Sequence, residues 1–294
     1  MTTNHREKTM RRVTSCLAIA GIALATTLNL QAAETDPALV QVIESRSAED
    51  RARDGARHPA ETLTFFQVAP GMTVAEALPG GGWYTKILAN YLGSEGTLYS
   101  LNYVDRMWPM FSFATEEWVE KRIKSNAEFA GKVAGFTDSG INAQGFTFNT
   151  VPDEAVGKVD RVLMIRALHN LNRFEASAGT RTQALASVRG MLAPDGLVGV
   201  VQHRLAESAP AEGADGSRGY LKQSEVIAMF EEAGFELVGS SEINANAKDK
   251  PGPEDVVWRL PPGLRGSKDD PEKRAAMEAI GESDRMTLLF RKAS

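Results

Sequence analysis

A short apolar strand, a glycine-rich turn and a helix follow one another around residue 80, and this succession most limits how the chain can fold. Residues 72–78 form an apolar run with a Pro-Gly pair on each side, which predicts a buried strand. Residues 83–92 carry apolar side chains at helical spacing, and residues 97–101 are typical of a second strand. A strand, a helix and a strand in this order favour a parallel sheet.

Helices and strands continue to alternate along the rest of the chain. We expect helices over 115–133, 180–192 and 224–233, with Thr115 as the N-terminal cap of the first. We expect strands over 145–151, 159–167, 197–202, 235–240 and 286–290, and a Pro-Asp-Gly turn at 194–196. The pattern predicts one α/β domain over 71–294 with a Rossmann-like, doubly wound and mostly parallel sheet of seven strands. Residues 34–70 are a polar helical lead-in, whose charge-dense part, 46–57, predicts a solvated helix at the domain edge.

The charge balance argues against a nucleic-acid partner. The chain has 33 Lys and Arg against 38 Asp and Glu, a formal charge of -5, and no basic stripe follows the first dozen residues. Neutralising phosphates requires clustered positive charge. A hydrophobic content of 43% is in the range of ordinary globular domains, so the chain has enough apolar residues for a core.

The first 33 residues have the layout of a secretory signal peptide. Arg11 and Arg12 end a basic region, residues 16–25 are apolar, and small residues follow at Ala32 and Ala33. Ten apolar residues are too few for a bilayer-spanning helix, which needs about 20. We therefore expect cleavage near Ala33, a periplasmic or secreted protein, and no stable membrane span after cleavage. The only cysteine, Cys16, would be lost with this segment.

The turn at Gly80, Gly81 and Gly82 is the best candidate for a ligand site. Glycines allow the backbone to approach a ligand closely, and the following helix N-terminus offers free N–H groups. The turn also leaves the carboxyl end of the first strand, where open α/β sheets bind ligands. A tight turn without a ligand is the alternative. Glu76, near the end of the same strand, is a second candidate for ligand contact.

From residue 53 to residue 292 the sequence resembles the class I S-adenosylmethionine-dependent methyltransferases, and among them a group of signal-bearing bacterial proteins. The resemblance is carried by Val74-Ala75-Glu76-Ala77-Leu78-Pro79-Gly80-Gly81-Gly82-Trp83-Tyr84-Thr85, by Asp160-Arg161-Val162-Leu163-Met164-Ile165-Arg166-Ala167-Leu168-His169-Asn170-Leu171, by Leu192-Ala193-Pro194-Asp195-Gly196 and by Gly281-Glu282-Ser283-Asp284-Arg285-Met286-Thr287-Leu288-Leu289-Phe290. It implies S-adenosylmethionine as cofactor and an antiparallel last strand.

Two positions depart from the family pattern. Leu78 stands where the family usually has its first glycine. Asn102 follows the second strand, where the family has an acid that holds both ribose hydroxyls. An amide can donate to one hydroxyl and accept from another, but it carries no charge. The resemblance implies that Glu76, Gly80, Gly81, Gly82 and Asn102 contact the cofactor.

Three side chains are candidates for work on the methyl acceptor. His169 and His203 are expected at the ends of two adjacent strands, on the rim of the proposed cleft, where a histidine can accept a proton or orient a nucleophile. Arg166 could bind a substrate carboxylate. The alternatives are a polar network for the histidines and a capped carbonyl for the arginine. Three histidines without regular spacing after residue 33 make no metal motif.

Two functions therefore stay open. The first is an exported methyltransferase that acts on a small molecule, and the second is a non-catalytic exported binding protein on the same scaffold. The aromatic group at Trp108, Phe111 and Phe113 predicts core or lid packing, with a substrate platform as the alternative.

Overall fold

A single mixed sheet organises the protein, as seen in a computed structural model that describes residues 1–2 and 34–294. Its strand order is β3-β2-β1-β4-β5-β8-β7, and the short β6 pairs with β5. The strands are β1 Thr73–Ala77, β2 Thr97–Asn102, β3 Asn142–Thr147, β4 Val159–Ile165, β5 Leu192–Leu205, β6 Leu221–Lys222, β7 Phe235–Ser241 and β8 Arg285–Lys292. The expected signal peptide, residues 1–33, lies almost wholly outside the described residues.

Strand directions confirm the predicted fold class. The neighbours from β3 to β5 are parallel, whereas β8 runs antiparallel between β5 and β7. Going outward from β1, the chain order runs through β2 and β3 on one side and through β4 and β5 on the other. This reversal opens a crevice at the carboxyl ends of β1 and β4, where doubly wound folds bind their ligands.

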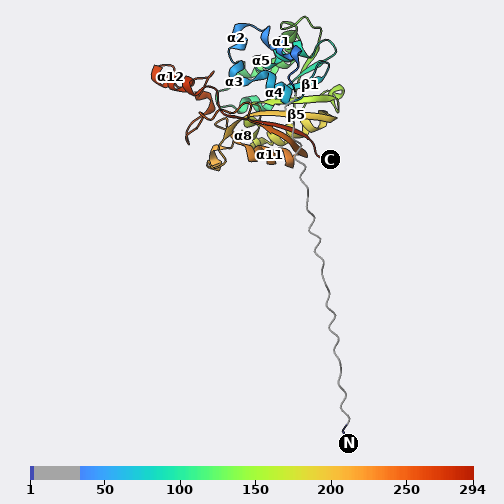
Figure 1. Cartoon of the computed structure of the whole chain (residues 1–294), viewed down its shortest axis with the longest axis vertical. Helices are drawn as coiled ribbons and strands as arrows, with labels where there is room; N and C mark the ends of the chain where they lie inside the picture. Colours follow the sequence, from blue (N-terminus) through green and yellow to red (C-terminus); the bar gives the residue numbers. More distant parts are fainter. Residues whose placement is uncertain (3–33) are drawn as a thin grey trace.

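Helices cover both faces of the sheet (Figure 1). On one face lie α1 Pro37–Glu44, α2 Ala48–Arg51, α3 Asp54–Arg57, α4 Pro59–Phe65 and α5 Trp83–Tyr91, and on the other α8 Leu168–Arg173 and α11 Gln223–Glu232. The remaining helices are α6 Glu116–Ala127, α7 Phe129–Ala134, α9 Glu175–Ala178, α10 Thr180–Met191 and α12 Pro271–Ile280, with 3-10 turns η1 Asp105–Met110, η2 Asp153–Ala155, η3 Ala211–Gly213 and η4 Val257–Arg259. Each face has its own buried apolar cluster.

Three predicted boundaries are wrong. The helix over 115–133 is divided into α6 and α7, since the buried Phe129 begins a new helix; its cap Thr115 is confirmed, because its hydroxyl accepts from the Trp118 N–H. The third strand begins at 142 and ends at 147, where a turn to Thr150 begins. The expected turn at 194–196 is an irregularity inside β5, where the register against β4 shifts.

The lead-in is more than a solvated helix at the edge. Two of its four helices, α1 and α4, bury Leu39, Ile43 and Leu63 in the apolar cluster that also contains α5. Polar side chains of the lead-in also pair with a residue distant in the sequence, since Arg53 and Arg57 contact Glu282.

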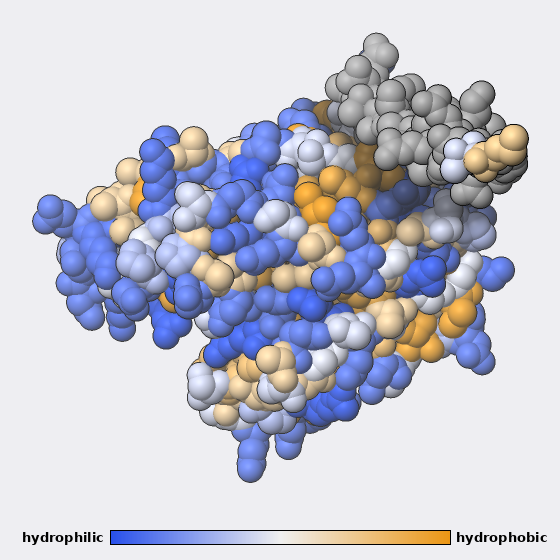
Figure 2. Space-filling model, turned by 90° about the horizontal axis from the view of Figure 1, so that it is seen from below, coloured by the Kyte–Doolittle hydropathy of each residue, from blue (hydrophilic) through white to orange (hydrophobic). Residues whose placement is uncertain are grey.

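Within the described residues, no helix is both long and apolar enough to span a bilayer. The face seen in Figure 2 is mainly hydrophilic, with hydrophobic side chains in separate groups.

Candidate functional site

The glycine turn after β1 uses left-handed backbone at three positions. Leu78, Gly80 and Gly82 have φ angles of 55°, 55° and 87°. A Cβ on Gly82 would lie 2.8 Å from Cε2 of Phe136, whereas a Cβ on Gly81 would meet nothing within 4 Å. Gly82 is thus required by local packing at the start of α5, and Gly80 is the glycine of this turn that lines cavities.

Leu78 occupies a conformation that strongly favours glycine. For an L-residue the left-handed region costs roughly 1–2 kcal/mol. The chain accepts this cost at the position where the resemblance expects a glycine, and the leucine side chain lines two cavities at once. Leu78 therefore forms part of the wall between them.

Glu76 is a buried carboxyl group beside this turn. Only 4% of the residue is exposed, and its Oε2 accepts a hydrogen bond of 2.6 Å from the hydroxyl of Thr85 on α5. Burial raises the pKa of Glu76 to about 7, although the Thr85 bond and the charge of Lys132 oppose the rise. Lys132 itself donates from Nζ to the Gly80 carbonyl over 2.6 Å.

Two cavities lie against the turn and the end of β2, and both contain Gly80, Asn102 and Arg122 in their walls. The first, of about 210 Å³, is mostly aromatic: its walls include Tyr103, Trp108, Phe111, Phe113 and Trp118. The second, of about 390 Å³, is more polar and is lined by Pro79, Gly80, Ser100, Asn102, Lys121, Arg122, Ser125, Glu128, Phe129 and Lys132. Trp108 and Phe111 therefore pack in the core and also line a cavity, whereas Phe113 in the same wall is 63% exposed.

Asn102 can offer a ligand mainly its carbonyl oxygen. Its Nδ2 donates to Ser100 Oγ at 3.0 Å and to Asn126 Oδ1 at 2.5 Å, which commits both amide hydrogens. A hydroxyl that donates to Oδ1 is the partner this arrangement fits.

Two further polar atoms in the walls of the aromatic cavity, Trp108 Nε1 and Asn170 Oδ1, are buried without a hydrogen-bond partner among the described residues. Buried polar atoms of this kind are costly unless a ligand or water pairs with them.

A third cavity, of about 360 Å³, adjoins the aromatic one and shares Leu78 and Asn170 with it. It brings together the three predicted acceptor-side residues, Arg166, His169 and His203. Arg166 follows β4 with a left-handed φ of 59°, and its N–H donates to Val201 O at 2.7 Å. The rest of the wall is lined by Ile165, Val257, Trp258, Leu260, Pro261, Pro262, Gly263, Glu282 and Ser283.

The two histidines are neutral and fixed by neighbours. Their ring centroids are 5.7 Å apart. His203 Nδ1 lies 2.6 Å from Ser283 Oγ, and His169 Nδ1 lies 3.3 Å from Gln202 Oε1. Burial lowers the pKa of His169 to about 4, and burial together with the charges of His169 and Arg166 lowers the pKa of His203 well below 6.5. At neutral pH both rings are therefore uncharged, and each can accept a hydrogen bond at the nitrogen that carries no proton.

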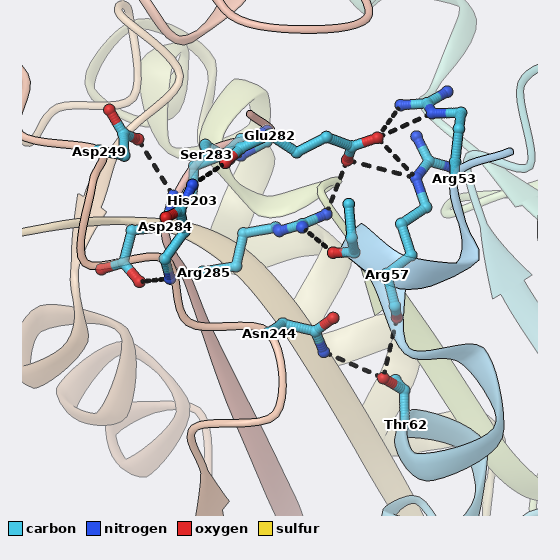
Figure 3. Close-up of polar contacts among 12 residues, drawn as sticks. Arg53, Arg57, Thr62, His203, Asn244, Asp249, Glu282, Ser283, Asp284 and Arg285 are labelled. Carbon is cyan, nitrogen blue, oxygen red and sulfur yellow. Dashed lines mark hydrogen bonds and ion pairs between the residues drawn. The ribbon is translucent and has the colours of Figure 1, made fainter. Parts of the chain in front are cut away.

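An arginine cluster lies behind the third cavity (Figure 3). The Glu282 carboxylate forms ion pairs with the guanidinium groups of three arginines. The nitrogen-to-oxygen distances are 2.6 Å for Arg53, 3.3 Å for Arg57 and 3.0 Å for Arg285. Although burial opposes ionisation, these three charges lower the pKa of Glu282. The cluster joins the lead-in to the beginning of β8 at the wall of the cavity.

Sequence reasoning missed Gln202, Ser283 and Glu282 as parts of this site. Glu282 and Ser283 lie in the polar stretch before the last strand, which the resemblance marked only as the end of the fold. A run of charged residues next to an apolar strand is the signal that could have pointed to them.

Within the part of the chain that the structure describes, no three His, Cys, Asp or Glu side chains gather as a metal site.

Searches for related proteins show likeness in structure only. No model of a protein family matches the chain, and no curated protein matches it. A S-adenosylmethionine-dependent methyltransferase from Aquifex aeolicus is 18% identical, with a TM-score of 0.44 over 72% of this chain and 94% of that one. A 1,6-didemethyltoxoflavin N1-methyltransferase from Burkholderia thailandensis, solved with bound 1,6-didemethyltoxoflavin and S-adenosylhomocysteine, is 12% identical, with a TM-score of 0.44 over 87% of this chain and 85% of that one. The cyclase SpnF is 12% identical, with a TM-score of 0.49 over 85% and 83%. At these identities the likeness concerns the fold alone.

Proposed function

We propose that the protein transfers a methyl group from S-adenosylmethionine to a small-molecule acceptor. The observation that carries the proposal is the pair of adjoining cavities at the strand-order reversal, which share Leu78 and Asn170. One cavity has the glycine turn and aromatic walls, and the other has two neutral histidines and an arginine. Two ligands bound side by side, one in each cavity, are what group transfer requires.

The residues present fit this cofactor chemically. The aromatic walls formed by Trp108, Phe111 and Trp118 suit a stacked base, and Asn102 Oδ1 suits a ribose hydroxyl. Trp108 Nε1 and Asn170 Oδ1 provide an unpaired donor and an unpaired acceptor beside the same cavity. When bound, S-adenosylmethionine supplies an electrophilic methyl group on a sulfonium.

The chain's own part in the reaction is to orient the acceptor, to exclude water and to accept a proton. In the tautomer in which Nδ1 of His203 donates to Ser283 Oγ, Nε2 has the free lone pair that accepts from a hydroxyl or amine of the methyl acceptor. Gln202 orients His169 in the same way, and its own Nε2 is fixed by the Gly219 carbonyl at 2.9 Å.

Calorimetric titration of the full chain with S-adenosylmethionine and S-adenosylhomocysteine tests the proposal. Gly80→Asp places a carboxylate in the wall of both cofactor-side cavities, and aspartate tolerates the left-handed backbone there. Gly140→Asp is the matched control, because Gly140 is exposed, has a left-handed φ of 76° and has no atom within 4 Å of an added Cβ. We expect saturable binding by the parent chain and by Gly140→Asp, and loss of binding in Gly80→Asp. An absence of binding by the parent chain at millimolar cofactor contradicts the proposal.

A binding protein without turnover is the second candidate, and two observations favour it. Leu78 places a side chain where a glycine would leave room for the cofactor, and Asn102 brings no charge to the ribose. If the calorimetric titration shows no cofactor binding, the same cavities hold another ligand.

Export is a separate part of the proposal and rests on residues 1–33. Cell fractionation of the chain with and without this segment measures it directly. We expect the shortened protein in the periplasm or the medium only when residues 1–33 are present at synthesis. Recovery of the unprocessed chain from the cytoplasm alone would rule out export.

A further inference from the structure

The third cavity and the arginine cluster behind it together carry positive charge in a protein that is acidic overall. Arg53, Arg57 and Arg285 all contact Glu282, and Arg166 lies in the cavity wall beside that carboxylate. Four guanidinium groups and one carboxylate leave a net charge of +3 at this place, while the whole chain carries -5. Among residues 34–294, Glu282 is the one carboxylate that any of these four arginines contacts.

A purely structural role explains three of these arginines but not Arg166. Arg53 and Arg57, from the lead-in, form ion pairs with Glu282. Arg285, at the beginning of β8, pairs with the same carboxylate (Figure 3). Within the described residues Arg166 has no hydrogen bond or ion pair from its guanidinium, yet it is held in a left-handed backbone conformation at the cavity. A half-buried cation without a partner is costly, and a bound anion offsets that cost.

One carboxylate, Glu282, shares the cavity wall with Arg166, but three other arginines contact it and no ion pair joins it to Arg166 among the described residues. His169 and His203 are neutral and offer no negative charge, and burial together with the charge of Arg166 lowers the pKa of Arg57 to about 9. The remaining wall combines polar groups of Asn170 and Ser283 with an apolar and aromatic part from Trp258 and the loop 260–263. The cavity thus combines one guanidinium without a hydrogen-bond partner in the described part of the chain and a partly apolar wall in a volume of about 360 Å³.

We infer that this cavity binds a small molecule with an anionic group, a phosphate or a carboxylate, and that Arg166 is the partner of that group. A guanidinium pairs with either anion through two parallel N–H bonds. The inference names the chemical class of the acceptor and in that respect rests on the proposed function. The anion site itself requires no cofactor.

Titration of the full chain with inorganic phosphate, and separately with acetate and benzoate, tests the inference at constant ionic strength and without S-adenosylmethionine. Tryptophan fluorescence and the melting temperature report binding, since Trp258 lies in the wall. The dissociation constants for phosphate and for the carboxylates show which type of anion the cavity prefers. The ratio of the dissociation constants for acetate and benzoate shows how much the apolar part of the wall contributes to binding.

Arg166→Asn removes the charge and keeps a residue that adopts left-handed backbone, whereas Arg166→Lys keeps the charge. Arg291→Gln, at the far end of β8, is the matched control because Arg291 pairs with Glu236 on the surface. We expect the dissociation constant for the favoured anion to rise at least about tenfold in Arg166→Asn, or about 1.4 kcal/mol. The rise in Arg166→Lys should be smaller, and Arg291→Gln should stay within about twofold of the parent chain.

The melting temperature without anion gives a second readout. An unpaired cation destabilises the empty site, so Arg166→Asn should melt at the parent temperature or above it. The inference is overturned if no anion binds saturably, if Arg166→Asn binds as the parent chain does, or if Arg166→Asn and Arg166→Lys both unfold. Because these titrations contain no cofactor, anion binding can succeed where cofactor binding fails, and the reverse.

Discussion

The buried carboxyl of Glu76 makes the protein less stable at high pH, and Glu76→Gln should remove that effect. Its pKa rises from 4.5 in an exposed chain to about 7 in the folded one. A carboxyl that binds its proton more tightly in the folded state loses stability as the pH rises between those two values. A difference of about 2.5 pKa units corresponds to roughly 3 kcal/mol at pH 8. Glutamine keeps an acceptor for the Thr85 hydroxyl and carries no charge.

Urea unfolding at pH 5 and pH 8 measures the effect. We expect Glu76→Gln to be more stable than the parent chain by about 3 kcal/mol at pH 8, or roughly 6–12 °C in Tm, and by less than about 1 kcal/mol at pH 5. Glu231→Gln, on the exposed face of α11, is the control and should differ little at either pH. Equal destabilisation of Glu76→Gln at both pH values would show that the reasoning is wrong and that the ionised carboxylate is stabilised.

Four further outcomes are expected. Gly82→Ala should lose about 2 kcal/mol of stability, because its Cβ meets Phe136 in a left-handed conformation, while Gly81→Ala should change little; thermal melts compare the two. Leu78→Gly should change the free energy of unfolding by no more than about 1 kcal/mol, since relief of strain offsets lost packing, and calorimetry should show tighter cofactor binding. Glu282→Gln should cost about 3 kcal/mol in urea unfolding by leaving buried arginines unpaired, and an unchanged midpoint would contradict the cluster's role. Neither cavity histidine should contribute an ionisation to the pH profile of kcat/KM between pH 8 and about 5, because both are already neutral, and a fall near 6.5 that persists in Glu76→Gln would refute that.

The sequence predicts those parts of the fold that depend on neighbouring residues. The strand, turn and helix from 73 to 91 follow from local apolar spacing and glycine positions, and the structure confirms them. The apolar run of β4 is also recognisable because a strand buried on both faces needs a continuous one. Arg166, His169 and His203 line one cavity because β4 and β5 are adjacent parallel strands, but His169 lies in α8 and not at the end of β4 as expected.

Other features depend on partners far along the chain. Arg53 and Glu282 are 229 positions apart, and an ion pair leaves no periodic pattern in the sequence. The Pro-Asp-Gly segment at 194–196 is typical of a turn, but pairing with β4 keeps it within β5. The left-handed backbone at Leu78 has no local signal, because leucine rarely adopts it.

The position of β8 has a consequence for synthesis. It follows every other strand in the chain, yet it is an inner strand of the sheet, and six of its eight residues are buried between β5 and β7. Until Arg285–Lys292 has been made, β5 and β7 expose unpaired edges that other chains can join. A nascent chain therefore needs protection against aggregation until its last strand is in place, and a stop codon shortly before residue 285 should yield insoluble protein rather than a smaller folded domain.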